Sequence, residues 1–179
     1  MKKDNFPIDE NVWDALISIC GTNNNLEQLK NTHKLVLNSG EELSTLVYNS
    51  LIHNYARCSD FETSISIFNE MPSNMKDSTT YSSMIGICGD LQNPSMAKKL
   101  YKEMIDKKIS IEEIGFDGLF QNLSKSLLLN EALNLYNTMQ EKFNISPSEH
   151  HYKIVREALE GVGRLEEARK LSYSSVQSI

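Results

Sequence analysis

Apolar side chains recur along this chain at the spacing of amphipathic helices. In residues 48–55, the apolar positions fall on one face of an α-helix: Tyr48, Leu51, Ile52 and Tyr55. Residues 61–71 repeat this spacing with Phe61, Ile65, Phe68 and Met71. A sustained alternation of apolar and polar residues, which would indicate a strand, is not found in the sequence. The pattern therefore predicts an all-α chain made of short helices in pairs.

The same pattern returns about every 35 residues. An aromatic residue opens each copy, at spacings of 35, 33, 35 and 36 residues: Trp13, Tyr48, Tyr81, Phe116 and Tyr152. An apolar residue, or a close neighbour of it, follows two to three positions later in each copy: Leu16, Leu51, Met84, Leu119 and Val155. Small residues mark the second helix of four copies: Ser64, Ala97, Ala132 and Ala168. Because independent markers keep one period, the chain is predicted to be a repeat protein.

One helical hairpin cannot bury its own apolar face, so such hairpins stack on one another and share a continuous core. We therefore predict an all-α solenoid, a right-handed α-α superhelix of about five hairpins. Residues 1–9 form an N-terminal extension in this interpretation, and residues 10–179 form the array. The predicted repeats are 10–44, 45–77, 78–112, 113–148 and 149–179, with the last one acting as a cap.

Capping residues indicate where several helices begin. Ser59 with Glu62, and Ser146 with Glu149, have the spacing of a capping box. Pro147 would then occupy the first helical position, which proline favours.

Two further patterns mark helix ends. Asn93 followed by Pro94 predicts another helix start. Gly21, Gly40 and Gly89 fit the C-terminal ends of helices, where a residue with left-handed backbone is common.

Composition excludes several classes of function. The three cysteines, Cys20, Cys58 and Cys88, are odd in number and widely spaced, which argues against a disulfide framework. His150 and His151 are adjacent, so on a helix their side chains diverge and do not easily share a metal. The sequence contains no C-x-x-C pair, glycine-rich phosphate loop or Ser/His/Asp grouping of recognisable spacing. We expect a protein that is not an enzyme, needs no cofactor or metal and does not span a membrane, since no apolar run approaches the ~18–20 residues of a span.

The repeat segments resemble the pentatricopeptide repeat (PPR) family from Glu10 onward. The resemblance rests on VYNSLI, TYSSMI, SIFNEM, KLYKEM and NLYNTM, which are similar to the openings and closings of that family's 35-residue helical hairpin. The alternation of longer and shorter repeats resembles the mixed long-and-short (PLS-like) subclass. Tetratricopeptide repeats have a similar period, but the proline and small residues that they favour are missing here.

The resemblance implies that the chain binds single-stranded RNA in a concave groove, about one base per repeat. In the family, each base is read by the residue after the aromatic and the residue that closes the repeat. The pairs carried over are Asp14 with Ser44, Asn49 with Asp77, Ser82 with Glu112, and Asp117 with Ser148. The resemblance implies a uracil preference for Asn49 with Asp77. Leu46 and Ile114, two residues before their aromatics, would wedge against a base.

The negative net charge and the small number of repeats argue against RNA binding. The chain has 18 basic and 24 acidic residues and a net charge of −6, whereas affinity for nucleic acid depends on Lys and Arg contacts to phosphate. The candidate phosphate contacts are Arg57, Lys125 and the cluster Lys98, Lys99 and Lys102, and the alternative for the cluster is a solvated outer face of a second helix. Four reading pairs specify little sequence, so we expect a protein partner that supplies catalysis or extra RNA affinity, or a longer array. The alternative function is a protein–protein interaction scaffold, which an acidic or apolar groove would favour over a basic one.

The N-terminal segment MKKDNFPIDEN lacks the apolar core of a secretory signal and the Arg/Ser-rich composition of a transit peptide. Members of the family mostly work in mitochondria or plastids. The resemblance alone therefore implies a mitochondrial location and a role in organellar RNA processing, editing or stability, and a cytoplasmic location stays open.

Overall fold

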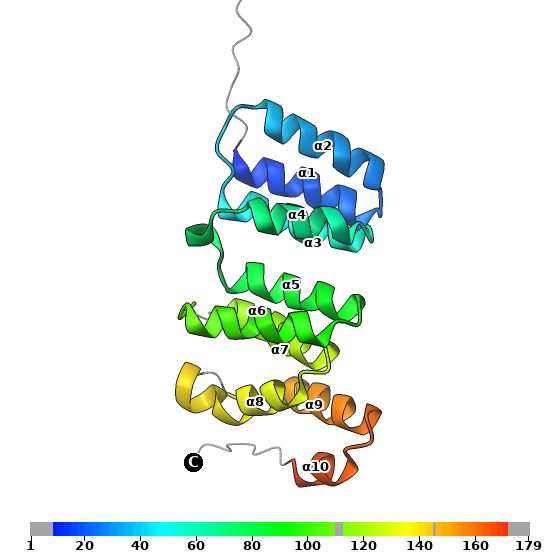
Figure 1. Cartoon of the computed structure of the whole chain (residues 1–179), viewed down its shortest axis with the longest axis vertical. Helices are drawn as coiled ribbons and strands as arrows, with labels where there is room; N and C mark the ends of the chain where they lie inside the picture. The colour runs from blue at the N-terminus through cyan, green and yellow to red at the C-terminus, as the bar shows by residue number, and fades with distance from the viewer. Residues whose placement is uncertain (1–8, 110–112, 145, 172–179) are drawn as a thin grey trace, which may run out of the picture. The chain divides into compact units, whose positions relative to one another are not determined.

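The computed structural model of this chain describes residues 9–109, 113–144 and 146–171, without the side chains of residues 113–118 and 143. Within these ranges every regular element is a helix, which confirms the all-α prediction. The chain divides into two compact units, Met1–Lys76 (unit 1) and Asp77–Ile179 (unit 2). Each unit is made of successive helical hairpins (Figure 1).

Unit 1 contains hairpins 1 and 2. Their helices are α1 (Glu10–Thr22) and α2 (Leu26–Asn38), then α3 (Thr45–Arg57) and α4 (Phe61–Glu70), followed by a short 3-10 helix, η1 (Ser73–Met75). The two helices of each hairpin pack together, and α1 also packs on α3. The first helices of the two hairpins therefore lie side by side, as the stacking of repeats requires.

Unit 2 contains hairpins 3, 4 and 5. Their helices are α5 (Ser78–Asp90) and α6 (Pro94–Asp106), α7 (Glu113–Lys125) and α8 (Leu129–Phe143), and α9 (Glu149–Gly161) and α10 (Leu165–Lys170). The first helices again form a row, because α5 packs on α7 and α7 packs on α9.

The small residues of the second helices are core residues, as predicted. Ser64, Ala97, Ala132 and Ala168 are all buried. Ser64 can replace alanine because its hydroxyl donates a hydrogen bond of 3.0 Å to the carbonyl of Ile52 on the partner helix. A small side chain lets the two helices of a hairpin approach closely. In Ser64 the buried hydroxyl donor is satisfied by this hydrogen bond.

The first of these apolar markers does not lie in the core. Leu16 is exposed, and Ile17 takes its place in the core of hairpin 1. The equivalent residues Leu51 and Val155 are fully buried because a preceding hairpin packs on them.

The turn inside each hairpin has a left-handed residue at one fixed position. These residues are spaced by 35, 33, 35 and 36: Asn24, Ser59, Gln92, Leu127 and Gly163, with φ between +50° and +79°. The prediction that Gly21 and Gly89 would hold this conformation is wrong, since both lie inside their helices. Gly40 does adopt it, at φ +75°, just after α2.

Two predicted helix starts are displaced by one or two residues. Asp60, not Ser59, caps α4 by accepting a hydrogen bond from the backbone N–H of Thr63 at 3.2 Å. Ser59 is unsuited to the cap because it forms the left-handed turn residue.

At α9 the cap is Ser148, not Ser146, and Pro147 precedes the helix. The prediction for α6 is confirmed, because Asn93 caps it by accepting from the N–H of Met96 at 3.0 Å and Pro94 is its first residue.

Candidate functional site

The residues predicted to close repeats share one structural role. Ser44, Asp77 and Ser148 are the N-caps of α3, α5 and α9, the first helices of the hairpins that follow. The Ser44 hydroxyl accepts a hydrogen bond from the N–H of Val47 at 3.4 Å. A side chain that caps a helix is held in a single orientation at the helix N-terminus.

Asp77 is the most firmly held of the three. Its Oδ1 accepts hydrogen bonds of 2.8 Å from both the N–H and the hydroxyl of Thr80. The Thr80 hydroxyl in turn accepts from the N–H of Asp77 at 3.1 Å, which completes a capping box. A carboxylate has about four lone-pair sites, so capping a helix does not exhaust its capacity as an acceptor.

Ser148 forms the corresponding box with His151. The Ser148 hydroxyl accepts from the N–H of His151 at 3.3 Å, and the N–H of Ser148 donates to His151 Nδ1 at 3.1 Å. His151 is buried, and its ring meets that of Phe120 edge to face at 5.3 Å between centroids. This histidine is therefore a structural residue of the cap and the core.

The residues that follow the aromatics differ in accessibility. Asp14 on α1 and Asn49 on α3 are half-buried in unit 1. Ser82 on α5 is only 5% exposed. Asn122 of α7 donates hydrogen bonds from Nδ2 to the carbonyl of Ser82 at 2.9 Å and to its hydroxyl at 3.1 Å. Ser82 is thus held by the next hairpin, so its role as a base reader requires Asn122 to release it.

Three predicted site residues lie outside the described side chains: Glu112, Ile114 and Asp117. Leu46, the other predicted wedge, is 38% exposed in the first turn of α3. Asn49 lies in unit 1 and Asp77 begins unit 2, so each is described within its own unit.

Two of the candidate phosphate contacts form salt bridges with carboxylates. Lys125 forms a salt bridge of 2.5 Å with Asp90, and Lys98 forms one of 3.3 Å with Glu131. Arg57 is exposed at the end of α3. Such surface ion pairs add little stability, but they lower the positive potential available to a phosphate.

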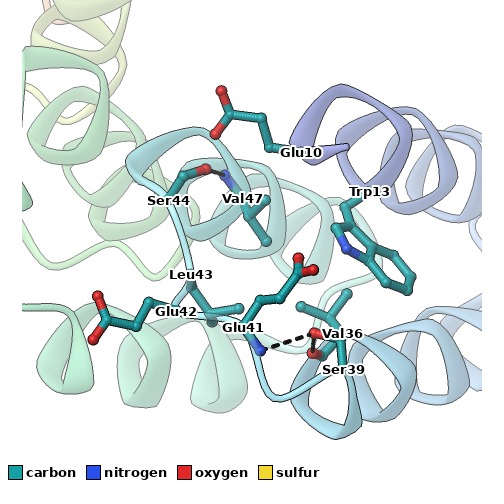
Figure 2. A pocket seen from close by; sticks show the side chains of 9 residues that line it. All are labelled: Glu10, Trp13, Val36, Ser39, Glu41, Glu42, Leu43, Ser44 and Val47. Atoms are coloured by element: carbon teal, nitrogen blue, oxygen red, sulfur yellow. Dashed lines mark hydrogen bonds between the residues drawn. The ribbon is translucent and has the colours of Figure 1, made fainter. Parts of the chain in front are cut away.

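Unit 1 has a pocket of about 210 Å³ where α1, the end of α2 and the start of α3 meet (Figure 2). The sequence pattern does not indicate this pocket, because its walls come from segments about 30 residues apart. Three exposed carboxylates surround it, and Ser44 and Trp13 lie on its walls. The lining residues are Glu10, Trp13, Val36, Ser39, Glu41, Glu42, Leu43, Ser44 and Val47.

The electrostatics of this pocket favour a cation over a phosphate. Glu10, Glu41 and Glu42 form no ion pair within the part of the chain that the structure describes. The Ser39 hydroxyl donates to the carbonyl of Val36 at 2.7 Å and accepts from the N–H of Glu41 at 3.3 Å, which fixes the loop that presents the acids. Carboxylates at this spacing repel a nucleic-acid backbone and attract Lys or Arg side chains.

The three cysteines are buried and free, and burial raises the pKa of Cys88 to about 11, so this thiol stays protonated at neutral pH. Among the described residues, no group of His, Cys, Asp and Glu is arranged to hold a metal. Within the same ranges, none of the helices combines the length and apolar content that a bilayer span requires.

The family model of the PPR repeat matches residues 46–74 and 79–109. Pentatricopeptide repeat-containing protein At3g14730 of Arabidopsis thaliana is 30% identical over 89% of this chain and 25% of its own length. The putative pentatricopeptide repeat-containing protein At5g59200, chloroplastic, of the same plant is 30% identical over 92% of this chain and 30% of its length. A relative named mitochondrial, At2g22410 of the same plant, is 28% identical over 97% of this chain and 25% of its own length. The chain therefore spans about a quarter to a third of these relatives.

Solved structures share the fold. PPR10 in complex with an 18-nt psaJ RNA element has a TM-score of 0.69 at 21% identity, over 93% of this chain and 25% of that one. The nuclear proteinaceous RNase P 2 of A. thaliana has a TM-score of 0.58 at 17% identity, over 90% of this chain and 37% of that one. These likenesses confirm the fold of stacked helical hairpins. Hairpins 2 and 3 therefore match the PPR repeat, and the chain resembles pentatricopeptide repeat-containing proteins over about nine-tenths of its length.

Proposed function

We propose that this protein binds single-stranded RNA through its repeats and has no catalytic activity of its own. The observation that carries the proposal is the recurrence of a polar side chain, Ser44, Asp77 or Ser148, fixed at the start of a first helix. A base reader must be held in one orientation, and capping provides this. The match of hairpins 2 and 3 to the PPR repeat and the likeness to the RNA-bound structure of PPR10 support the same function.

In this proposal Asn49 and Asp77 read one base and Leu46 wedges against it. Asn49 is half-buried and Leu46 is exposed three residues earlier on α3, as a wedge must be. Asp14 with Ser44, Ser82 with Glu112, and Asp117 with Ser148 are the remaining proposed pairs, and Ile114 is the second wedge. Among these, Ser82 is the weakest reader, because Asn122 occupies its hydroxyl.

The finer assignments rest on the family. We propose five repeats between residues 10 and 179, of the mixed long-and-short subclass, acting in RNA processing, editing or stability. Relatives named mitochondrial and chloroplastic favour an organelle, with mitochondria as the first choice. A protein partner would supply catalysis or additional RNA affinity, because Glu131 and Asp90 partly neutralise the candidate phosphate contacts Lys98 and Lys125.

The test is RNA binding by fluorescence anisotropy at low salt, using an oligomer selected from a random pool. Asn49→Ala together with Asp77→Ala should weaken binding by ~1–3 kcal/mol, by analogy with the loss of a bidentate base contact. Thr80→Val is the matched control, since it breaks the capping box and leaves both proposed readers in place. Equal losses in the control and the double variant would refute base reading by this pair. Affinity no higher than that of an unrelated acidic protein would refute RNA binding altogether.

A second candidate function is a protein-binding scaffold, and the acidic pocket of unit 1 is the observation that favours it. The pocket would accept a Lys- or Arg-bearing segment of a partner protein. Glu41→Lys with Glu42→Lys separates the two functions. If unit 1 contacts RNA, the charge reversal strengthens RNA binding and steepens its salt dependence. If unit 1 contacts a basic segment, the reversal abolishes partner capture that RNase treatment leaves intact.

A further inference from the structure

Two polar side chains of α7 join this helix to α5. Asn122 donates from Nδ2 to the carbonyl of Ser82 at 2.9 Å and to its hydroxyl at 3.1 Å. Four residues later, the hydroxyl of Ser126 donates to the carbonyl of Ile85 at 2.8 Å. Ser82 and Ser126 are 5% and 3% exposed, so both contacts lie inside the interface between hairpins 3 and 4.

Two glycines of α5 leave room for these side chains. A Cβ added to Gly86 would lie 2.8 Å from Oδ1 of Asn122, and one added to Gly89 would lie 3.1 Å from the hydroxyl of Ser126. Because glycine has no Cβ, another helix can approach its backbone closely. The amide of Asn122 therefore reaches past Gly86 to the backbone and the side chain of Ser82.

The carbonyl of Ser82 sets the orientation of the Asn122 amide. A carbonyl oxygen only accepts hydrogen bonds, so the NH2 end of the amide must face it, and that end has two N–H groups for the two oxygens of Ser82. The Ser82 hydroxyl thus acts as an acceptor within the protein. A nucleotide base that needs this hydroxyl must displace Asn122 or reach a side chain that is 5% exposed.

The same register position has a different role in unit 1. Asn54 lies six residues after its aromatic, as Asn122 does. Its Nδ2 donates to the carbonyl and the hydroxyl of Ser50 in its own helix, at 2.8 Å and 3.4 Å. Asp14, the proposed reader of the preceding hairpin, is half-buried. The asparagine therefore holds the proposed reader of the preceding hairpin in unit 2, where that reader is Ser82, and not in unit 1.

We propose that Asn122 is a specificity-determining residue, which prevents hairpin 3 from selecting a base. This proposal rests on the function proposed above, the binding of single-stranded RNA. The RNA that the chain prefers then has an unselected nucleotide at hairpin 3, next to the nucleotide that Asn49 and Asp77 select. Ser82 with Glu112 becomes a reading pair only when Asn122 is removed.

Base preference is measured by fluorescence anisotropy with the oligomer that the parent chain selects from a random pool. The double variant Asn49→Ala with Asp77→Ala identifies the nucleotide that this pair selects. Each of its two neighbours is then replaced by all four bases, since a repeat takes about one base. In the parent chain, Ser82→Ala should change the relative affinities at both neighbours by less than about twofold, which is below the effect of one net hydrogen bond. A larger change would mean that Ser82 already reads a base, and would overturn the proposal.

Asn122→Ala should release Ser82 and create a preference of about threefold to tenfold at one of the two neighbours, as one net hydrogen bond allows. Adding Ser82→Ala to this variant should remove the new preference. Ser126→Ala is the matched control, because it removes the other side-chain bond between α7 and α5 and leaves Asn122 on Ser82. No new preference in Asn122→Ala, or an equal one in Ser126→Ala, would overturn the proposal. If Asn122→Ala does not fold, the Ser82→Ala result decides.

The two proposals fail in different ways. Absence of RNA binding by the parent chain would overturn both. Suppose instead that the parent binds RNA with a base preference that Asn49→Ala and Asp77→Ala remove, and that Asn122→Ala creates no second preference. The proposed function would then stand, and the proposed role of Asn122 alone would be overturned.

Discussion

The two units place an asparagine at the same repeat position and use it differently. Asn54 of unit 1 and Asn122 of unit 2 each lie six residues after the aromatic that opens the repeat. Asn54 is buried and donates to the carbonyl of Ser50 at 2.8 Å, within its own helix. Asn122 donates instead across the hairpin boundary, to the carbonyl and the hydroxyl of Ser82.

The neighbouring glycines explain this difference. A Cβ added to Gly21 of α1 would lie 2.0 Å from Oδ1 of Asn54 and 2.7 Å from its Cβ. The whole Asn54 side chain therefore packs directly against the backbone of Gly21. A Cβ added to Gly86 of α5 would lie 2.8 Å from Oδ1 of Asn122 and meet only the amide end. In unit 1 asparagine contributes packing, whereas in unit 2 it contributes a hydrogen bond between hairpins. Equivalent positions in a repeat therefore need not have equivalent roles.

The largest effect is expected from Gly21→Ala. The new methyl group would clash with Asn54, and overpacking of this kind costs about 2–3 kcal/mol, more than the ~1 kcal/mol that alanine gains in helix propensity. Urea unfolding should show the loss, and Asn54→Gly should restore much of it. Gly86→Ala is the comparison in unit 2 and should cost less, because the amide end of Asn122 can move. Equal costs at the two glycines would contradict the proposed difference.

Asn122→Ala should destabilise the protein by about 1–1.5 kcal/mol, since it removes both bonds that join α7 to Ser82. Hydrogen exchange should increase in α5 and α7. Asn54→Ala breaks a bond within one helix, so increased exchange should stay within α3. If Asn122→Ala leaves exchange in α5 unchanged, Asn122 does not hold the two hairpins together.

Leu127→Gly should stabilise unit 2 by about 0.5–1 kcal/mol. Leu127 is exposed and has φ +59° at the turn between α7 and α8, a conformation that costs a residue with a Cβ roughly 1–2 kcal/mol. The equivalent residue of hairpin 5 is Gly163, which adopts φ +79° without this cost. Thermal unfolding monitored by circular dichroism measures the gain, and Gly163→Leu should show the opposite change.

A smaller effect is expected from pH in unit 1. Burial lowers the pKa of His33 below its ordinary value of 6.5, although Glu70 acts in the opposite direction, and Nδ1 of His33 lies 3.0 Å from the hydroxyl of Tyr55. Burial, and then Asp60 and Cys58, raises the pKa of Tyr55 to about 12, so this hydroxyl keeps its proton at neutral pH.

Because the folded state binds the His33 proton more weakly than the unfolded state does, stability is full above pH 6.5 and falls as the pH drops below it. Urea midpoints between pH 7.5 and pH 5 should decrease, and His33→Gln should reduce the slope. An unchanged slope in this variant would assign the pH dependence to other groups, such as His53, whose pKa burial and Arg57 also lower.

Several features could be predicted from the sequence because they depend on local spacing. The aromatic markers, the small residues at Ser64 and Ala97 and the Asn93 cap all follow from helical periodicity and from capping chemistry within four residues. The proposed readers Ser44 and Asp77 were located by resemblance, and their capping role was missed. The available indication was their spacing, because Ser44 and Asp77 each lie three residues before a backbone N–H in the first turn of a helix.

Other features could not be predicted because they depend on partners far away in the chain. The exposure of Leu16 depends on whether another hairpin packs on it, and helical periodicity alone cannot say this. The hydrogen bond from Asn122 to Ser82 joins residues that are 40 positions apart in the sequence. The displacement of the α4 cap from Ser59 to Asp60 followed from the left-handed turn that Ser59 must form.

The sequence by itself determined the period, the helical hairpins and the residues between them that are small enough to pack, because these follow from side-chain spacing on an α-helix. Only the tertiary structure decided which polar side chains stay accessible to a ligand and which are held by another hairpin. The reason is physical: burial and hydrogen bonding of a repeat residue are set by the neighbouring hairpin, which differs at each step of the array.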